Sequence, residues 1–244
     1  GHLQYIKRAA SLLDTFILSR QNVEVTAKRY YKHVGTGVYE VLRESPGWLE
    51  PRQEQVVILS ADLVGSTEYA HAETNPFAVF RHINAYLGMI GKIVKSHNGA
   101  LDKYLGDEVM GFFGAPVPDS KRSINALNCA LRILADLEVM NEQRTADGEP
   151  TFQVKITIGL VDCVVGEVGS PETQTDYTVI GRDVNQFFRI ATHGEPNAVI
   201  VNEAYREEMK DTCEFEFVGR AAFKGVDKEL AIHRLVLEPT SSEE

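Results

Sequence analysis

One short apolar run constrains the fold of this chain more than any other feature. Val56–Leu59 is continuous, apolar and rich in β-branched residues. A run of this kind is typical of a strand that is buried on both faces. It is followed closely by Ala61 and Asp62, so the sequence predicts a central strand that carries a carboxylate at its end.

The flanking segments predict an alternation of helices and strands. Asn75 as N-cap, Pro76 at the first helical position and Gly99 after the last turn delimit one helix, and a second is expected from Ser120 to about Gln143. Gly106-Asp107 separates two apolar segments and predicts a tight hairpin. Further strands are expected at 154–161, 177–180, 198–201, 214–218 and 231–236, further helices at 183–193 and 203–209, and a turn-rich stretch around Gly166 and Gly169. This order predicts an α+β fold, a ferredoxin-like, antiparallel-rich sheet with helices on one face.

The chain divides into three parts on composition. Residues 1–53 are expected to form a helical segment and a linker that contains Pro46 and Pro51, residues 54–237 the main domain, and residues 238–244 an acidic tail. We interpret Gly1-His2 as a tag remnant. The first segment has the spacing either of a coiled-coil seam or of an amphipathic helix that packs on its own domain. That spacing is carried by Leu3, Ile6, Ala10, Leu13 and Ile17.

Composition excludes several classes of protein. A net charge of −10 over 244 residues argues against a nonspecific nucleic-acid binder, which needs a basic face. The apolar runs are too short to span a bilayer. Cys129, Cys163 and Cys213 are scattered, which disfavours structural zinc and disulfides and favours a reducing, cytoplasmic location.

Two acidic residues stand out by position. Asp62 ends a buried strand and Asp107 lies in the hairpin turn, so both are placed to hold Mg²⁺, which prefers carboxylate oxygens. The alternative for Asp107 is a plain turn role, since Asp is common in tight turns. The small residues that follow Asp62 can direct backbone N–H groups at an anion, or simply cap a helix. They include Val64, Gly65, Ser66 and Thr67.

A third group lies on the predicted helix at 183–193. Asn185 and Arg189 are four positions apart and share a helix face. Arg189 could clamp phosphate oxygens and Asn185 could hold a sugar hydroxyl. A solvated helix face is the alternative for this pair in isolation.

Taken together, these segments resemble the class III nucleotidyl cyclases. Three motifs, at 60–67, 99–110 and 176–189, occur in the family's order, and the resemblance covers about Glu54 to Val236. The stretch before them is similar to the transducer element that links bacterial cyclases to upstream sensors. The resemblance therefore implies a cyclase catalytic domain regulated by an upstream sensor.

The resemblance also implies a role for each site residue. Asp62 and Asp107, with the backbone carbonyl of Leu63, would hold two divalent ions per site, Mg²⁺ or Mn²⁺. Lys103 and Thr178 match the pair that recognises the purine, and this combination implies adenine. The remaining roles are ribose orientation, transition-state stabilisation and contact with the terminal phosphates, implied for Asn185, Arg189 and Lys224.

The implied activity is conversion of ATP to 3′,5′-cyclic AMP and pyrophosphate by two-metal catalysis. The family solution is a head-to-tail homodimer, in which each site takes Asp62 and Asp107 from one chain and the other residues from its partner. Two alternatives stay open: a weak or inactive cyclase-homology domain that binds nucleotide, and a guanylyl cyclase. Phe187 and Phe188 lie where small residues are usual, and we expect them to reshape the purine pocket.

Overall fold

The computed structural model describes residues 45–170, 172, 174–222 and 229–237. The predicted N-terminal helical segment, Lys224 and the acidic tail lie outside the described residues. No described helix combines the length and apolar character that a membrane span requires.

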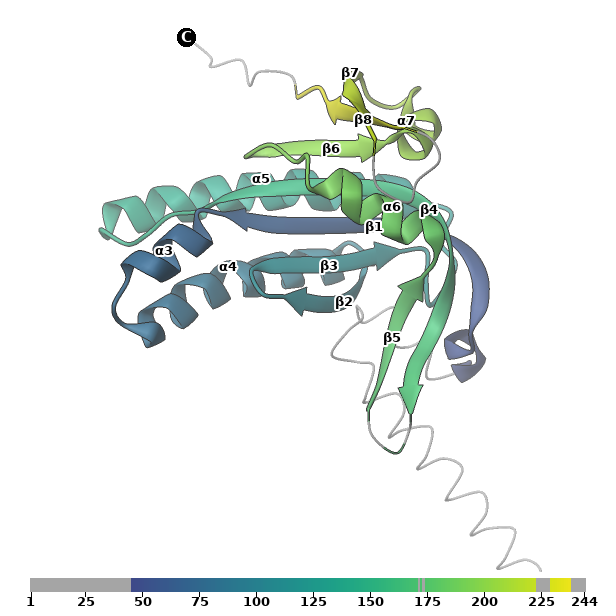
Figure 1. Ribbon diagram of the computed structural model, residues 1–244, viewed down its shortest axis with the longest axis horizontal. Coiled ribbons are helices and arrows are strands. Elements are labelled where there is room, and N and C mark those ends of the chain that lie inside the picture. The colour runs from purple at the N-terminus through teal and green to yellow at the C-terminus, as the bar shows by residue number, and fades with distance from the viewer. Residues whose placement is uncertain (1–44, 171, 173, 223–228, 238–244) are drawn as a thin grey trace, which may run out of the picture.

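The described chain forms one eight-stranded sheet with helices packed on it (Figure 1). The strand order is β2-β3-β1-β4-β6-β8-β7, and β5 pairs with β4 outside this path. Only the β4–β6 pairing is parallel among the described strands. The strands are β1 Arg52–Val64, β2 Ala100–Leu105, β3 Glu108–Phe113, β4 Gln153–Ser170, β5 Gln174–Ile180, β6 Ala198–Asn202, β7 Phe215–Ala221 and β8 Leu230–Leu235. The helices are the 3₁₀ turn η1 Pro46–Leu49 and the α-helices α3 Ser66–Ala72, α4 Pro76–Ser96, α5 Arg122–Ala146, α6 Arg182–Ala191 and α7 Glu203–Met209. The predicted α+β class is confirmed.

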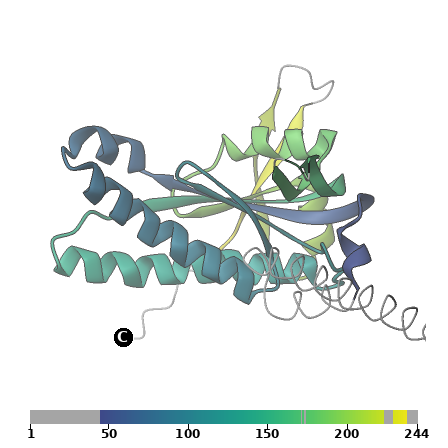
Figure 2. The same cartoon turned by 90° about the horizontal axis from the view of Figure 1, so that it is seen from below.

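The sheet is covered on both faces (Figure 2). Val57 and Leu59 of β1 pack into one core with Ile90 of α4 and Ile133 of α5. Side chains alternate along a strand, so the neighbouring Val56 and Ile58 face the other way. They share a second core with Phe112 of β3 and with Val184 and Phe187 of α6. The helices therefore do not all lie on one face as expected, because the buried run in the middle of β1 needs a cover on each side.

The local signals that delimited the first helix and the hairpin are confirmed. Asn75 caps α4, since its side-chain oxygen accepts a hydrogen bond from the backbone N–H of Phe77 at 3.1 Å. Gly106 joins β2 to β3 with φ of 66°, a conformation that costs glycine little.

The stretch around Gly166 differs from the expectation, because it is part of β4 and not a turn. A Cβ at Gly166 would lie 2.6 Å from Cα of Pro51, so only glycine allows the start of β1 to pass so close. β4 bends along this part of its length, and β5 returns beside it (Figure 1). The bend brings β5 to β2, although the two strands are not paired with each other.

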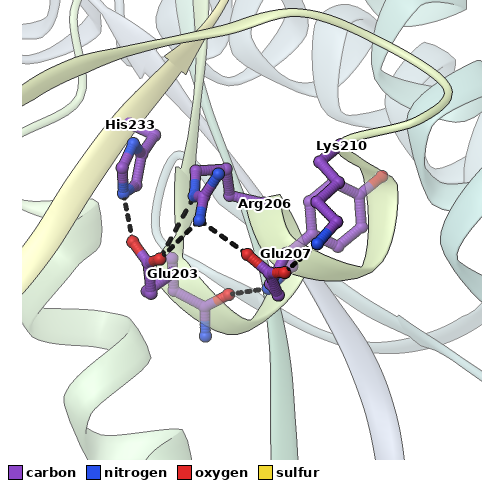
Figure 3. Close-up of polar contacts among 7 residues, drawn as sticks. Glu203, Arg206, Glu207, Lys210 and His233 are labelled. Atoms are coloured by element: carbon purple, nitrogen blue, oxygen red, sulfur yellow. Dashed lines mark hydrogen bonds and ion pairs between the residues drawn. The ribbon is translucent and has the colours of Figure 1, made fainter.

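Ion pairs connect several charged side chains of α7 with one another and with a histidine of β8 (Figure 3). Arg206 Nη2 lies 2.8 Å from Glu203 and 2.7 Å from Glu207, and Glu203 also contacts His233 of β8. The hydrogen bond from Arg206 holds the pKa of Glu203 below its ordinary value. Apart from His233, which is buried, these side chains are largely exposed, and exposed ion pairs contribute little stability.

Candidate active site

The end of β1 and the β2–β3 turn bring the predicted carboxylates together. The backbone N–H of Leu63 donates to the carbonyl oxygen of Asp107 at 3.3 Å. Ser66 Oγ hydrogen-bonds Asp107 Oδ2 and lies 3.2 Å from the carbonyl oxygen of Leu63. We call Asp62, Leu63, Ser66 and Asp107 the carboxylate end of the site.

Negative charge dominates the carboxylate end. Burial and the negative charge of Asp107 raise the pKa of Asp62, while Lys155, whose Nζ lies 4.0 Å from Asp62 Oδ2, opposes this shift. Burial also raises the pKa of Glu108, with smaller contributions from Asp62 and Asp107, against the hydrogen bond from Ser60. Among the described residues, Lys155 is the cation that lies against this group of carboxylates, and a bound cation would relieve the repulsion.

The carboxylate end fits a divalent ion on the chemistry of its donors. Mg²⁺ commonly takes one or two protein carboxylates and completes its shell with phosphate oxygens and water. Asp62 and Asp107 supply that number, and the carbonyl oxygen of Leu63 faces the same cluster through Ser66. Within the described ranges no group of three or more His, Cys, Asp or Glu side chains is arranged to hold a metal alone.

The segment after Asp62 turns sharply into α3. Gly65 has φ of 88°, a left-handed conformation, and the helix begins at Ser66. Ser66 is buried and Thr67 is exposed. Of the four predicted phosphate-contacting residues, Val64, Gly65, Ser66 and Thr67, the structure ties Ser66 to Asp107 directly.

A second polar group forms where β2 meets β5, and we call it the base end of the site. Lys103 Nζ donates to Thr178 Oγ1 at 3.3 Å, and Thr178 Oγ1 donates to Asp102 Oδ2 at 2.8 Å. Lys103 Nζ also lies 3.4 Å from Asp102 Oδ1. The structure therefore joins the two predicted purine-recognising residues, which are 75 positions apart, through bonds within one chain.

Sequence reasoning missed Asp102. The side chain of Asp102 is fully buried, and burial raises the pKa of its carboxyl against the hydrogen bond from Thr178 and the charge of Lys103. A carboxylate within a short strand, directly before the predicted base-contacting lysine, is the signal that could have revealed it.

The predicted ribose and phosphate residues project from α6. Asn185 and Arg189 are both exposed, and neither side chain makes a hydrogen bond or an ion pair with any residue that the structure describes. Phe187 faces inward instead: it is 1% exposed and packs so closely that a Cβ at Gly159 would lie 2.6 Å from its ring. Phe187 therefore fills the second core, where it meets Phe188 edge to face, and any effect of the two rings on a purine pocket stays a prediction.

Comparison with known protein families assigns the chain to one of them. The model of the adenylate and guanylate cyclase catalytic domain matches residues 49–236. The chain therefore belongs to the class III cyclases, through their catalytic domain.

Particular relatives include enzymes of both nucleotide specificities. The chain is 28% identical over 186 residues to adenylate cyclase 1 of Rhizobium meliloti, which covers 75% of this chain and 28% of that protein. The chain thus spans little more than a quarter of that curated relative. Its fold is similar to crystal structures of the adenylyl cyclase CyaB from P. aeruginosa, with TM-score 0.73 and 27% identity, and of the guanylyl cyclase Cya2, with TM-score 0.70 and 28% identity. Each alignment covers 79% of this chain and 98% of the solved chain.

Proposed function

We propose that this chain is an adenylyl cyclase that converts ATP to 3′,5′-cyclic AMP and pyrophosphate. The observation that carries the proposal is the bond between Lys103 and Thr178 at the base end. An ammonium can only donate, so Lys103 suits the N1 acceptor of adenine. Thr178 can accept from the exocyclic amine, whereas guanine in the same pose would present a donor to the ammonium.

The carboxylate end would take the triphosphate. Asp62 and Asp107, with the carbonyl of Leu63, would hold the divalent ions, Mg²⁺ or Mn²⁺. Bound ions supply Lewis acidity toward the ribose 3′-hydroxyl and neutralise charge on the leaving pyrophosphate. Ser66 keeps Asp107 oriented, and the turn at 64–67 would lie along the phosphates.

Two residues of α6 would complete the site. Arg189 is always charged and offers several donors in a fixed plane, which suits the developing charge at the α-phosphorus. Asn185, one turn earlier on the same face, would orient the ribose. Lys224 would contact the terminal phosphates.

A head-to-tail homodimer would bring these parts together. The side chains of Asn185 and Arg189 are exposed and make no hydrogen bond or ion pair with the described residues of their own chain, as expected for side chains that serve a partner. A twofold dimer in which each chain supplies one carboxylate end and one α6 contains two equivalent sites. In the longer protein, the N-terminal segment would pass on the state of an upstream sensor to a catalytic domain in the cytoplasm.

Guanylyl cyclase is the second candidate. The observation in its favour is that similarity to the guanylyl cyclase Cya2 is as high as similarity to the adenylyl cyclase CyaB, at 28% and 27% identity. The two candidates differ only at the base end, because the carboxylate chemistry is shared.

Product analysis tests the proposal. The purified dimer is incubated with ATP or GTP in the presence of Mn²⁺ or Mg²⁺, and cyclic AMP and cyclic GMP are quantified, with Asp62→Ala as the control for contaminating cyclase. We expect cyclic AMP from ATP, with far less cyclic GMP. Predominant cyclic GMP would establish the second candidate, and nucleotide binding with no product under either metal would establish a binding module.

A further inference from the structure

A bulge in β2 places Asp102 beside the base-recognising pair. Leu101 pairs with Gly111 and Lys103 pairs with Met110, so Asp102 is the extra residue between two consecutive partners on β3. In a regular strand, neighbouring side chains point to opposite faces. The bulge instead lets Asp102 and Lys103 both reach Thr178, and bulges often redirect a side chain in this way beside active sites.

Hydrogen-bond accounting shows what Asp102 does to Thr178. A threonine hydroxyl has one proton to donate and two lone pairs to accept with. Thr178 gives its proton to Asp102 Oδ2 at 2.8 Å and accepts from Lys103 Nζ at 3.3 Å. What remains at Thr178 is one lone pair, so toward a ligand the hydroxyl acts only as an acceptor.

The same accounting applies to Lys103. Its ammonium has three donors, and one of them bonds Thr178 Oγ1, while the carboxylate of Asp102 lies at ion-pair distance, 3.4 Å away. At least one donor is left for a ligand. The base end therefore presents a donor and an acceptor, which matches N1 and the exocyclic amine of adenine and opposes the corresponding groups of guanine.

Asp102 is poorly explained by stability alone. Its carboxyl is fully buried, and Oδ1 makes no hydrogen bond within the described part of the chain, since Lys103 is at ion-pair distance but lacks hydrogen-bond geometry. A buried, incompletely bonded carboxylate costs stability in most settings. A residue retained only for packing would not need this charge.

We infer that Asp102 is a positioning residue for nucleotide selectivity, which fixes the Thr178 hydroxyl as an acceptor and so favours adenine over guanine. This inference rests on the proposed function, because it assumes that Lys103 and Thr178 face the base. It adds a residue that contacts no part of the nucleotide and acts only through its neighbours.

Asp102→Asn is the decisive variant, since it keeps the size of the side chain but adds donors. The amide can donate to Thr178 Oγ1, which frees the hydroxyl proton to bond the carbonyl oxygen of guanine. Thr178→Val removes the hydroxyl that Asp102 is inferred to orient. Asp176→Asn is the matched control: Asp176 is exposed on β5 and close enough for its charge to raise the pKa of Asp102, but it does not hold Thr178.

The readout is the ratio of affinities for 3′-deoxy-ATP and 3′-deoxy-GTP, which lack the attacking hydroxyl, measured by titration calorimetry with Mn²⁺. We expect Asp102→Asn to lower the preference for the adenine nucleotide by roughly tenfold. Asp176→Asn should leave it within about twofold. In the Thr178→Val background, Asp102→Asn should not change the affinity ratio further, because the hydroxyl through which Asp102 acts is absent.

The possible outcomes distinguish a failure of this inference from a failure of the proposed function. A parent protein that prefers the adenine analogue, together with an unchanged ratio in Asp102→Asn, overturns the inference alone. A parent that binds neither analogue, or prefers the guanine analogue, overturns the proposed function and the inference with it. Should thermal unfolding show that Asp102→Asn does not fold, Asp102→Ser, which also accepts and donates, replaces it with the same expectation.

Discussion

The carboxylate end and the base end of the site are held by different kinds of interaction. At the carboxylate end, Asp62 and Asp107 repel each other, and Lys155 at 4.0 Å from Asp62 is the nearby counter-charge. At the base end, the carboxylate of Asp102 faces both a hydroxyl donor and an ammonium. The first arrangement is improved by adding a cation, whereas the second already contains a counter-charge for its carboxylate.

This contrast indicates which part of the site depends on a bound ligand for its stability. The base end is assembled within one chain by the bend of β4 and the bulge of β2, so on our proposal selectivity would be set before a nucleotide arrives. The repulsion between Asp62 and Asp107 at the carboxylate end would be relieved by bound divalent ions. Catalysis should therefore respond strongly to changes at the carboxylate end, whereas binding preference should respond to changes at the base end.

The largest expected effect is the loss of activity in Asp107→Asn. The amide keeps a partner for Ser66 but removes the charge of a proposed metal ligand. Because a bound metal contributes several kcal/mol of transition-state stabilisation, cyclic AMP formation should fall by roughly 10³-fold or more. Glu108→Gln is the neighbouring control, since Glu108 is engaged by Ser60, and it should lose less than about tenfold. Retention of a tenth of the parent activity by Asp107→Asn would contradict the assignment.

An intermediate effect is expected from Gly166→Ala, which disturbs the bend that supports the base end. The new Cβ would lie 2.6 Å from Cα of Pro51, and overpacking of this kind costs about 1–3 kcal/mol. We expect a lower Tm and a higher KM for ATP, with an unchanged metal concentration for half-maximal activity. Gly47→Ala is the matched control, because its Cβ would meet no atom within 4 Å. Equal Tm values for the two variants would show that the bend does not depend on Gly166.

The smallest effect concerns the stability of the metal-free protein. The raised pKa of Asp62 means that the folded state holds this proton to higher pH than the unfolded chain does, so ionisation of Asp62 lowers stability as pH rises through the raised pKa. Asp62→Asn should therefore raise the Tm in a chelator at neutral pH, and the gain should vanish at pH values where Asp62 is protonated in both states.

Added Mn²⁺ sharpens that measurement. Ligands that bind only the folded state stabilise it, so Mn²⁺ should raise the Tm of the parent more than that of Asp62→Asn. A variant that is less stable than the parent in chelator would mean that the ion pair with Lys155 outweighs burial and repulsion.

Much of the fold could be predicted because its signals are local. The cap at Asn75, the glycine turn at Gly106 and the apolar run of β1 each determine their own structure within a few residues. The stretch around Gly166 was predicted to be a turn, but this glycine is needed where Pro51 passes close to β4. Pro51 is 115 positions away in the sequence, so the contact cannot be recognised from the residues next to Gly166. The placement of α6 on the second face likewise depends on the packing of Phe187 against β4.

The site was predictable to the extent that it is made of motifs. Asp62 and Asp107 were expected together, and the structure brings them together; Lys103 and Thr178 were paired only through a family resemblance, and the structure gives the bond. Asp102 was missed because its role depends on a bulge, and a bulge is visible only when the register of β2 on β3 is known. The roles of these residues in catalysis stay predictions.

The central claim is that each site combines the carboxylate end of one chain with the base end and α6 of its partner, and complementation tests it most directly. Asp62→Ala and Arg189→Ala are each expected to be inactive as homodimers. When the two variants are mixed and allowed to exchange subunits, half of the dimers should contain both, and each of these has one intact site. The account predicts recovery of about a quarter of the parent activity. No recovery in mixtures shown to contain heterodimers would contradict it, because both ends would then have to come from the same chain.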